Sequence, residues 1–208
     1  MSAESIVVIG AGGHGKVVVS TLFAAGIRVP CVLDDAREKW GTDVLGVPVR
    51  GPVSDEVESG RVGVLGIGQN EERKRFAEAL SLDWETVIHP HAWVHPSVSV
   101  GAGTVIFAGA IIQPDTVIGR HAIVNTGTLI DHDCVIGDYA HVAPGVQLAG
   151  DVKLGEGVFF GIGSSAIPGV QVGGWTTVGA GAAVVGDLPA NVTAVGVPAR
   201  VLEREGHR

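Results

Sequence analysis

The sequence has few charged residues, few aromatic residues and no long hydrophobic segment. Charged residues make up 17% and aromatic residues 5% of the 208 positions, whereas glycine occurs 32 times. The mean hydropathy is positive, yet no window holds the roughly eighteen uninterrupted apolar residues that a membrane-spanning helix requires. We therefore expect no membrane span, and the length suffices for two modest domains with a substantial core.

An excess of positive charge and a disulfide framework are also lacking. The net charge of −8 argues against nucleic acid and anionic membrane surfaces as partners. The two cysteines, Cys31 and Cys134, do not make a disulfide framework, and Cys134 is expected to be a small buried residue. The N-terminal residues lack the basic segment of a signal peptide. We therefore expect a cytoplasmic protein.

An apolar residue recurs at every sixth position from Val94 to Val184, in sixteen units. A second series of mostly small or branched residues follows four positions after each, from Val98 to Leu188. A six-residue period fits neither a helix face nor an alternating strand, and it is typical of a parallel β-helix. We predict a triangular prism in which three units close one coil, so that residue i lies beneath residue i+18, about 4.8 Å away. Successive hairpins would instead show a period of two and variable turns.

The first ninety residues alternate predicted strands and helices. Strands are expected at 5–9, 30–33 and 62–67, and helices after the first and third strands, ending near residue 25 and spanning about 71–80. This alternation predicts a small α/β domain with a parallel sheet. We expect three parts: the α/β domain at 1–90, the β-helix at 91–190, and a last strand with a charged tail at 191–208.

A glycine-rich turn, Gly10-x-Gly12-x-x-Gly15, joins the first strand to the first helix. Such glycines let backbone amides approach phosphate oxygens at a helix N-terminus. The domain is only half the size of a dinucleotide domain, so a mononucleotide or a nucleotide-sugar pyrophosphate is the expected ligand of this Rossmann-like unit. A turn needed only for strand–helix packing is the alternative. The expected substrate contacts, including an acidic pair for ribose or base, are Gly10, Gly12, Gly13, His14, Asp34, Asp35 and Asn70.

His132 lies between two aspartates at an outward corner of the predicted prism. A carboxylate that takes the Nδ1 proton leaves Nε2 as a base and stabilises the imidazolium that forms. We expect Asp133 in this role, and Asp131 is as close in sequence. Gly150 follows His132 by one coil, so its backbone amide would lie beside the imidazole as an oxyanion donor.

His141 follows His132 by nine residues, or half a coil, so the two imidazoles point in different directions within one chain. They could share a site only across two chains. Three flat faces suit closed threefold packing, and we therefore expect a homotrimer with sites between subunits. No metal site is expected. The other histidines are expected at solvent or in local hydrogen bonds, namely His89, His91, His95, His121 and His207.

Five short motifs stand out: Gly10-Ala11-Gly12-Gly13-His14-Gly15, Asn125-Thr126-Gly127 followed by Asp131-His132-Asp133-Cys134, His141-Val142-Ala143-Pro144-Gly145, Leu148-Ala149-Gly150, and Gly196-Val197-Pro198-Ala199-Arg200. Together they resemble the hexapeptide-repeat (left-handed β-helix) acyltransferases, specifically the nucleotide-sugar N-acetyltransferases of the bacillosamine and perosamine type, close to sialic acid O-acetyltransferases. The resemblance covers nearly the whole chain.

The resemblance implies a left-handed coil, a homotrimer and a role for each matching residue. His132 matches the catalytic base and Asp133 the acid that orients it, where some members carry glutamate. Asp34 and Asp35 match an acidic pair near the nucleotide. The positions expected to contact acetyl-CoA, its acetyl group or the sugar are Asn125, His141, Gly150, Ala180 and Pro198.

We predict transfer of an acetyl group from acetyl-CoA to the amine of a nucleotide-linked amino sugar, a UDP-, GDP- or dTDP-4-amino-4,6-dideoxy sugar, for bacterial surface glycan synthesis. His132 would act as a general base, without a covalent acyl-enzyme. The alternatives are O-acetylation of a sugar such as sialic acid, an NAD-dependent oxidoreductase built on the glycine turn, and a non-catalytic trimer that senses nucleotide sugars.

Overall fold

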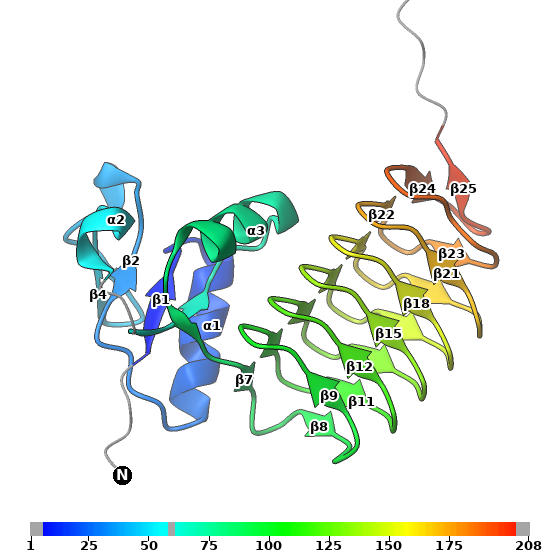
Figure 1. The fold of residues 1–208 in the computed structure, drawn as a ribbon, viewed down its shortest axis with the longest axis horizontal. Helices are drawn as coiled ribbons and strands as arrows, with labels where there is room; N and C mark the ends of the chain where they lie inside the picture. Colours follow the sequence, from blue (N-terminus) through cyan, green and yellow to red (C-terminus); the bar gives the residue numbers. More distant parts are fainter. Residues whose placement is uncertain (1–5, 58–60, 203–208) are drawn as a thin grey trace, which may run out of the picture.

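The computed structural model describes residues 6–57 and 61–202. These residues form an α/β domain joined to a long triangular prism (Figure 1). The predicted beginning of the first strand at residue 5 and the charged tail at 203–208, with His207, lie outside the described residues. Among the residues that are described, no helix is both long and apolar enough to cross a membrane.

The α/β domain is built on one sheet with the strand order β3-β4-β2-β1-β5-β6, parallel except for the β3–β4 hairpin. Val8 at its centre pairs with Val32 on one side and Val64 on the other, so the three predicted strands lie side by side. The hairpin and two short helical turns between residues 37 and 56 were not expected. The elements are β1 (Val7–Ile9), α1 (Gly13–Ala24), β2 (Val32–Leu33), η1 (Arg37–Lys39), β3 (Asp43–Val44), β4 (Val47–Arg50), α2 (Val53–Glu56), β5 (Val62–Leu65), α3 (Asn70–Ala79) and β6 (Asp83–Trp84).

The prism consists of two-residue strands stacked in parallel sheets. Ile106 pairs with Val124 and Ile130 pairs with Leu148, eighteen positions apart, so the predicted coil length is confirmed. One sheet contains β7 (Val87–Ile88), β10 (Val105–Ile106), β13 (Ile123–Val124), β16 (His141–Val142), β19 (Phe159–Phe160), β22 (Thr177–Val178), β24 (Thr193–Val195) and the antiparallel β25 (Arg200–Val201).

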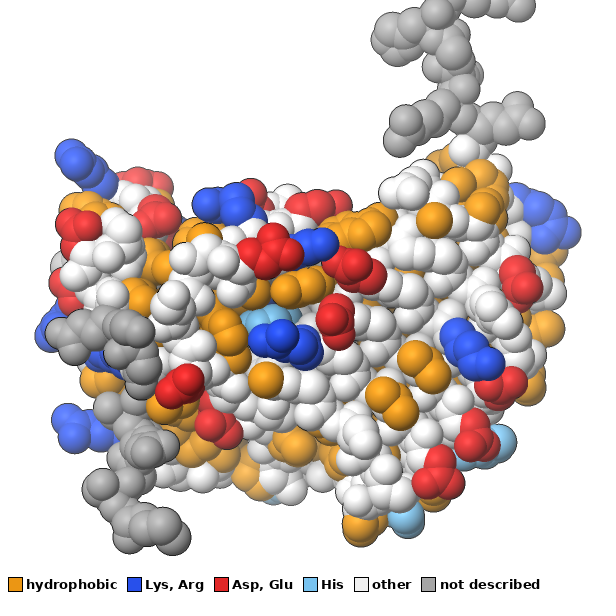
Figure 2. Space-filling model, viewed as in Figure 1, with side chains coloured by type: hydrophobic (Ala, Val, Ile, Leu, Met, Phe, Trp, Pro, Cys, Tyr) orange, Lys and Arg blue, Asp and Glu red, His pale blue; other side chains and the backbone are white. Residues whose placement is uncertain are grey.

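The other two sheets form the remaining faces of the prism. The second contains β8 (Trp93–Val94), β11 (Ile111–Ile112), β14 (Leu129–Ile130), β17 (Gln147–Leu148), β20 (Ser165–Ala166) and β23 (Ala183–Val184). The third contains β9 (Ser99–Val100), β12 (Val117–Ile118), β15 (Val135–Ile136), β18 (Lys153–Leu154) and β21 (Gln171–Val172). Figure 2 shows that charged side chains are scattered over the prism surface in view, between uncharged groups and backbone.

The two six-residue series form the core of the prism. From Ile106 to Val184 the apolar series is at most 6% exposed, and from Thr104 to Ala182 the small-residue series is at most 3% exposed. Cys134 belongs to the second series and is fully buried, as expected. Because each strand has only two residues, stability comes from stacking many coils on one continuous core.

The register changes in the last coil. Thr177 pairs with Thr193 and Val172 with Leu188, so this coil is two residues shorter than the repeat predicts. Leu188 therefore takes an inward apolar position and not the small-residue position that the period assigned to it. Pro189 has no amide hydrogen to continue a ladder, which ends the regular strand. At the other end β7 already belongs to the prism sheet, ahead of residue 91, where the β-helix was expected to begin.

The α/β domain packs against the first coils of one face of the prism, with α1 beside β7 (Figure 1). The domain also helps to bury a coil corner at His121. The Trp84 ring of the domain packs edge-on against the His121 ring, with centroids 5.0 Å apart, and Tyr139 of the next coil stacks on His121 with centroids 5.5 Å apart. His121 is consequently 1% exposed, contrary to expectation, and burial lowers its pKa to about 4. The shared apolar core of domain and prism includes Val18, Val19, Leu22, Val87, Val105, Phe107 and Ile123.

Adjacent residues of β15 provide a test of the prism. Ile136 is 1% exposed and Val135 is 39% exposed. We expect Ile136→Ala to lower the free energy of unfolding by about 2–5 kcal/mol through lost burial and a cavity, and Val135→Ala by about 0.5 kcal/mol or less. Denaturant unfolding of both variants measures this, and equal losses would contradict the inward and outward assignment.

Candidate active site

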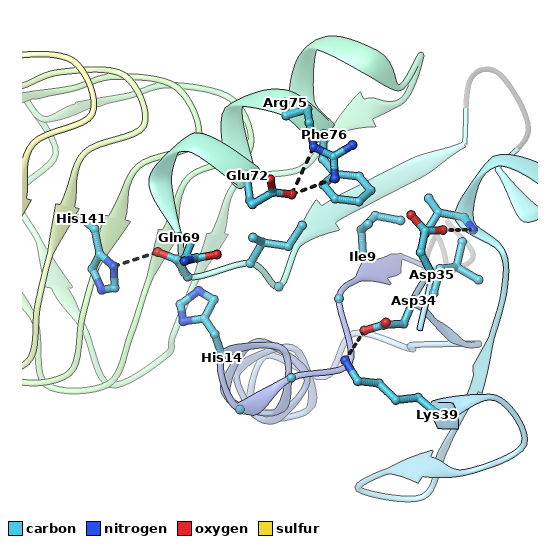
Figure 3. Close-up of a pocket in the computed structure, with 18 of the residues that line it drawn as sticks. Ile9, His14, Asp34, Asp35, Lys39, Gln69, Glu72, Arg75, Phe76 and His141 are labelled. Carbon is cyan, nitrogen blue, oxygen red and sulfur yellow. Dashed lines mark hydrogen bonds and ion pairs between the residues drawn. The ribbon is translucent and has the colours of Figure 1, made fainter. Parts of the chain in front are cut away.

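A pocket of about 650 Å³ lies where the α/β domain meets the prism (Figure 3). Its volume falls in the range of small-molecule sites, about 300–1,000 Å³. The pocket brings together most of the expected substrate contacts, namely Gly10, Gly12, Gly13, His14, Asp34 and Asp35, and adds His141 and Phe159 from the prism.

The glycines of the turn have different roles. A Cβ at Gly15 would collide with the carbonyl oxygen of Gly10, so this glycine permits close packing of α1 on β1. Apart from their neighbours in the chain, no described residue places a heavy atom within 4 Å of a Cβ position at Gly12 or Gly13, and both glycines line the pocket. The N-terminus of α1 therefore borders the pocket, and the first amides of a helix lack acceptors within the helix and favour an anion.

The two aspartates of the acidic pair differ in their hydrogen bonds. Asp34 accepts three, from Lys39 Nζ (2.8 Å) and the backbone amides of Ala11 (2.7 Å) and Ala36 (2.9 Å). Burial alone would raise the pKa of Asp34, but these donors outweigh it and hold the pKa below its usual value. Among the described residues, Asp35 accepts one hydrogen bond, from the Val53 amide at 2.8 Å. Asp34 thus holds the glycine turn in place, and Asp35 has more capacity left for a ligand.

Two histidines form the end of the pocket nearest the prism. Figure 3 shows His14 at the start of α1 and His141 on the same side, opposite Asp34 and Asp35; the two rings are 6.0 Å apart. Burial, with a smaller contribution from the other charges, lowers the pKa of His14 to about 3 and that of His141 to about 4. Both imidazoles are therefore neutral at physiological pH. Within the described part of the chain, His14 Nε2 has no hydrogen-bond partner.

Several pocket residues were not expected from the sequence. Glu72 and Arg75 pair at 2.7 Å across one turn of α3, and the Arg75 guanidinium lies 4.4 Å from the Phe76 ring centroid. All three line the pocket. The only sequence signal was a run of alternating charges, which is usual on any exposed helix.

Asn70 does not line the pocket, in contrast to its expected contact with substrate. It is 6% exposed, and its Nδ2 donates to the carbonyl oxygens of Gly157 (2.9 Å) and Val158 (3.3 Å) in the prism. The first turn of α3 packs on a coil corner, so this amide joins the domain to the prism.

His132 lies at an exposed corner between β14 and β15. Its Nδ1 is 2.7 Å from Asp133 Oδ2, and the two side chains are 59% and 61% exposed. Asp133 has a left-handed φ of 59°, a conformation that aspartate tolerates at turns. Asp131 instead accepts the backbone amide of His132 at 2.8 Å. The geometry therefore selects Asp133, whose hydrogen bond, with the charge of Asp131, raises the pKa of His132 above its ordinary value.

Gly150 lies directly against the His132 ring, as the coil register predicts. A Cβ at Gly150 would be 2.6 Å from His132 Cε1 and 2.8 Å from Nε2, so only glycine leaves room for the imidazole. The next residue, Asp151, donates its amide to the His132 carbonyl at 2.9 Å. Together with Pro168, these groups line a shallow depression of about 400 Å³.

The remaining expected contacts lie on a different edge of the prism. Asn125 sits between β13 and β14 and donates to His141 Nε2 at 3.0 Å. Ala180 lies on the same edge three coils later, and Pro198 is in the turn between β24 and β25; both are exposed. The pocket and the His132 corner are thus separate sites on one chain.

The fold and these two sites define a left-handed β-helix protein with an exposed histidine–aspartate pair at one coil corner and a separate pocket of small-molecule size. Comparison with known proteins agrees. Residues 5–80 match the PglD N-terminal domain, and residues 115–150 match the bacterial transferase hexapeptide family. PerB from Caulobacter crescentus, solved in complex with CoA and GDP-perosamine, is 40% identical over 97% of this chain and 99% of its own, with a TM-score of 0.87.

Two further relatives support the same family assignment. The acetyltransferase domain of PglB from Neisseria gonorrhoeae is 35% identical over 96% of this chain and 100% of its own, with a TM-score of 0.89. The UDP-N-acetylbacillosamine N-acetyltransferase of Bacillus subtilis is 41% identical over 115 residues, which span 48% of this chain and half the length of that curated relative. The chain belongs to the family of hexapeptide-repeat acyltransferases with a PglD-type N-terminal domain, which includes N-acetyltransferases of nucleotide amino sugars.

The contact of Gly150 with His132 can be tested without knowledge of the substrate. We expect Gly150→Ala to push the exposed imidazole away from Asp133, so that the raised pKa of His132 falls towards the ordinary histidine value of about 6.5. Gly186, two coils later on the same edge, has no atom within 4 Å of a Cβ position, and Gly186→Ala should leave this pKa unchanged. Titration of the histidine NMR signals measures both, and an unchanged His132 in Gly150→Ala would contradict the contact.

Proposed function

We propose that this chain transfers the acetyl group of acetyl-CoA to the amine of a nucleotide-linked amino sugar, with His132 as general base. The observation that carries the proposal is the exposed His132–Asp133 pair, which leaves Nε2 open to solvent beside the Gly150 amide. The relatives named as sugar N-acetyltransferases, and those solved with CoA or acetyl-CoA, support the choice of reaction.

The nucleotide sugar occupies the pocket of the α/β domain. Its diphosphate lies at the open amides of Gly12, Gly13 and the first turn of α1, where the helix dipole favours negative charge. Asp35 accepts hydrogen bonds from the ribose or base. The sugar then extends towards His14 and His141, whose neutral rings do not repel its amine.

In the reaction, His132 Nε2 takes a proton from the amine as the nitrogen attacks the thioester carbonyl carbon. The carbonyl becomes an oxyanion, which accepts a hydrogen bond from the Gly150 amide. The C–S bond then breaks, and the imidazolium returns its proton to the departing thiolate. Asp133 stabilises the imidazolium meanwhile. Burial raises the pKa of the Cys134 thiol to about 11, so this residue is not a nucleophile at neutral pH.

The complete site is formed between subunits of a homotrimer. Within one chain the sugar pocket and His132 lie at different edges, so a second chain must bring its His132 to the pocket of the first. The face between these edges carries an apolar row suited to a subunit interface: Trp93, Ile111 and Leu129 are 48%, 38% and 40% exposed. We also propose a cytoplasmic location.

Replacement of His132 tests the base. We expect His132→Ala to lower kcat/KM by about 10²–10⁴-fold, the usual contribution of a general base, in an assay of CoA release with UDP-, GDP- and dTDP-linked amino sugars. Because the base must be neutral and its pKa is raised, wild-type kcat/KM should fall as the pH drops through that pKa. Near-normal activity of His132→Ala, or equal turnover of hydroxyl sugars, would refute the proposal.

Replacement of Leu129 tests the assembly. We expect the wild type to sediment at about three times the 21.3 kDa chain mass, and Leu129→Glu to dissociate the trimer and lose activity because it buries a charge in the interface. Val117, 47% exposed on the third sheet, is the matched control, and Val117→Glu should remain trimeric. Sedimentation of the wild type as a monomer at micromolar concentration would contradict the shared site.

A further inference from the structure

Arg73 is a buried arginine with no carboxylate partner among residues 6–57 and 61–202. It is 1% exposed, and burial lowers its pKa to about 9, so it stays charged at neutral pH. Its guanidinium donates to the oxygen atoms of three separate segments. The acceptors are the carbonyls of Ile67 and Gly68 (both 3.1 Å), His121 (2.8 Å), Tyr139 (2.6 Å) and Ala140 (3.4 Å), and the Asn70 side chain (2.9 Å).

One of these acceptors connects Arg73 to the pocket. The Gly68 carbonyl takes a hydrogen bond from Arg73 Nη1 at 3.1 Å and another from His141 Nδ1 at 3.2 Å. A carbonyl oxygen can only accept, so His141 Nδ1 must carry its hydrogen in this arrangement. The loop after β5, held by Arg73, thereby determines which nitrogen of His141 is protonated.

The hydrogen bond at the second ring nitrogen of His141, Nε2, indicates the same tautomer. Asn125 Oδ1 accepts the Thr126 backbone amide at 2.8 Å, so the Asn125 amide group turns its Nδ2 towards His141 Nε2, 3.0 Å away. Nε2 is therefore the acceptor. Backbone groups define both ends, and a neutral His141 with hydrogen on Nδ1 is the arrangement that satisfies every bond.

We propose that Arg73 is a positioning residue for the pocket: through the Gly68 carbonyl it holds His141 as the neutral Nδ1–H tautomer, whose Nε2 accepts from Asn125 at the sugar end. The charged or titratable groups that face His141 are His14 from α1 and Arg73 from α3. Burial disfavours a proton on His141 most, and the Arg73 charge repels it as well, whereas His14 is itself neutral.

Arg73 lies at the contact between the α/β domain and the prism, and its positive charge has a role there. Its acceptors belong to the loop that lines the sugar pocket and to two successive coil corners, so one side chain sets the distance between the α/β domain and the prism. A carboxylate partner would cancel the Arg73 charge, which adds to the effect of burial in keeping His141 neutral. Backbone carbonyls satisfy the guanidinium and leave its charge in place.

The tautomer can be measured directly on the wild-type protein. With ¹⁵N-labelled histidine, and the His141 signals identified by their loss in His141→Gln, we expect a protonated Nδ1 and an unprotonated Nε2 over the usual titration range of histidine, about pH 5 to 8. An Nε2–H tautomer, or titration near the ordinary histidine value, would overturn the proposal without any change to Arg73.

Arg73 variants then test the cause, with a matched control on the same helix. Arg73→Lys keeps the charge but cannot reach all the acceptors, so we expect mixed His141 tautomers and a KM for the nucleotide amino sugar that rises about ten- to a hundredfold, with the KM for acetyl-CoA within about twofold of wild type. Lys74 also joins α3 to the prism, through Glu156 at 2.6 Å and the Trp175 ring at 5.5 Å. Lys74→Met should leave the His141 spectrum and both KM values unchanged.

The NMR spectrum of His141 and the KM for the amino sugar test this proposal separately from the proposed function. Only the KM measurement depends on the proposed function. A folded Arg73→Lys with an unchanged His141 spectrum would refute the proposal for Arg73, even if KM rises, because Arg73 would then only hold the domains together. Altered tautomers in Arg73→Lys but not in Lys74→Met would support it, even if no amino sugar is acetylated.

Discussion

The structure depends on the constant length of its coils. Each strand is only two residues long and would not persist alone; parallel ladders to the coils above and below satisfy its backbone groups. A constant coil means that side chains one turn apart stack. His132 therefore lies over Gly150, and the inward series forms one apolar column. The last coil is two residues shorter, and the prism ends soon after with the antiparallel β25.

The α/β domain makes one face of the prism different from the others. By covering the sheet that carries β16, it turns an outward-facing histidine, His141, into a buried wall of a pocket. The joint is made by the first turn of α3, where Asn70 and Arg73 donate to carbonyls of the coils. Burying an arginine against carbonyl oxygens is favourable only when nearly all its N–H groups are bonded, as they are here, so this joint has little freedom to slide.

The histidines of the two sites differ in pKa because their surroundings differ. His132 is exposed beside a carboxylate that raises its pKa, which suits the general-base role proposed for it. His14 and His141 are buried near Arg73, and their lowered pKa values keep them neutral. The same side chain is thus suited to proton transfer at one place and to uncharged hydrogen bonding at the other.

The features that depend on local spacing could be predicted from the sequence: the six-residue period, the glycine turn before α1, and the pairing of His132 with an adjacent aspartate over Gly150. These follow from period and sequence distance, which need no knowledge of distant contacts. The three-dimensional contacts were needed to show that Asp133 and not Asp131 bonds His132 Nδ1, that Asp34 supports the turn, that Asn70 and Arg73 join the domains, and that His121 is buried. The period places every coil corner at the surface of the prism, and only the docking of the α/β domain determines which corners lose their contact with water.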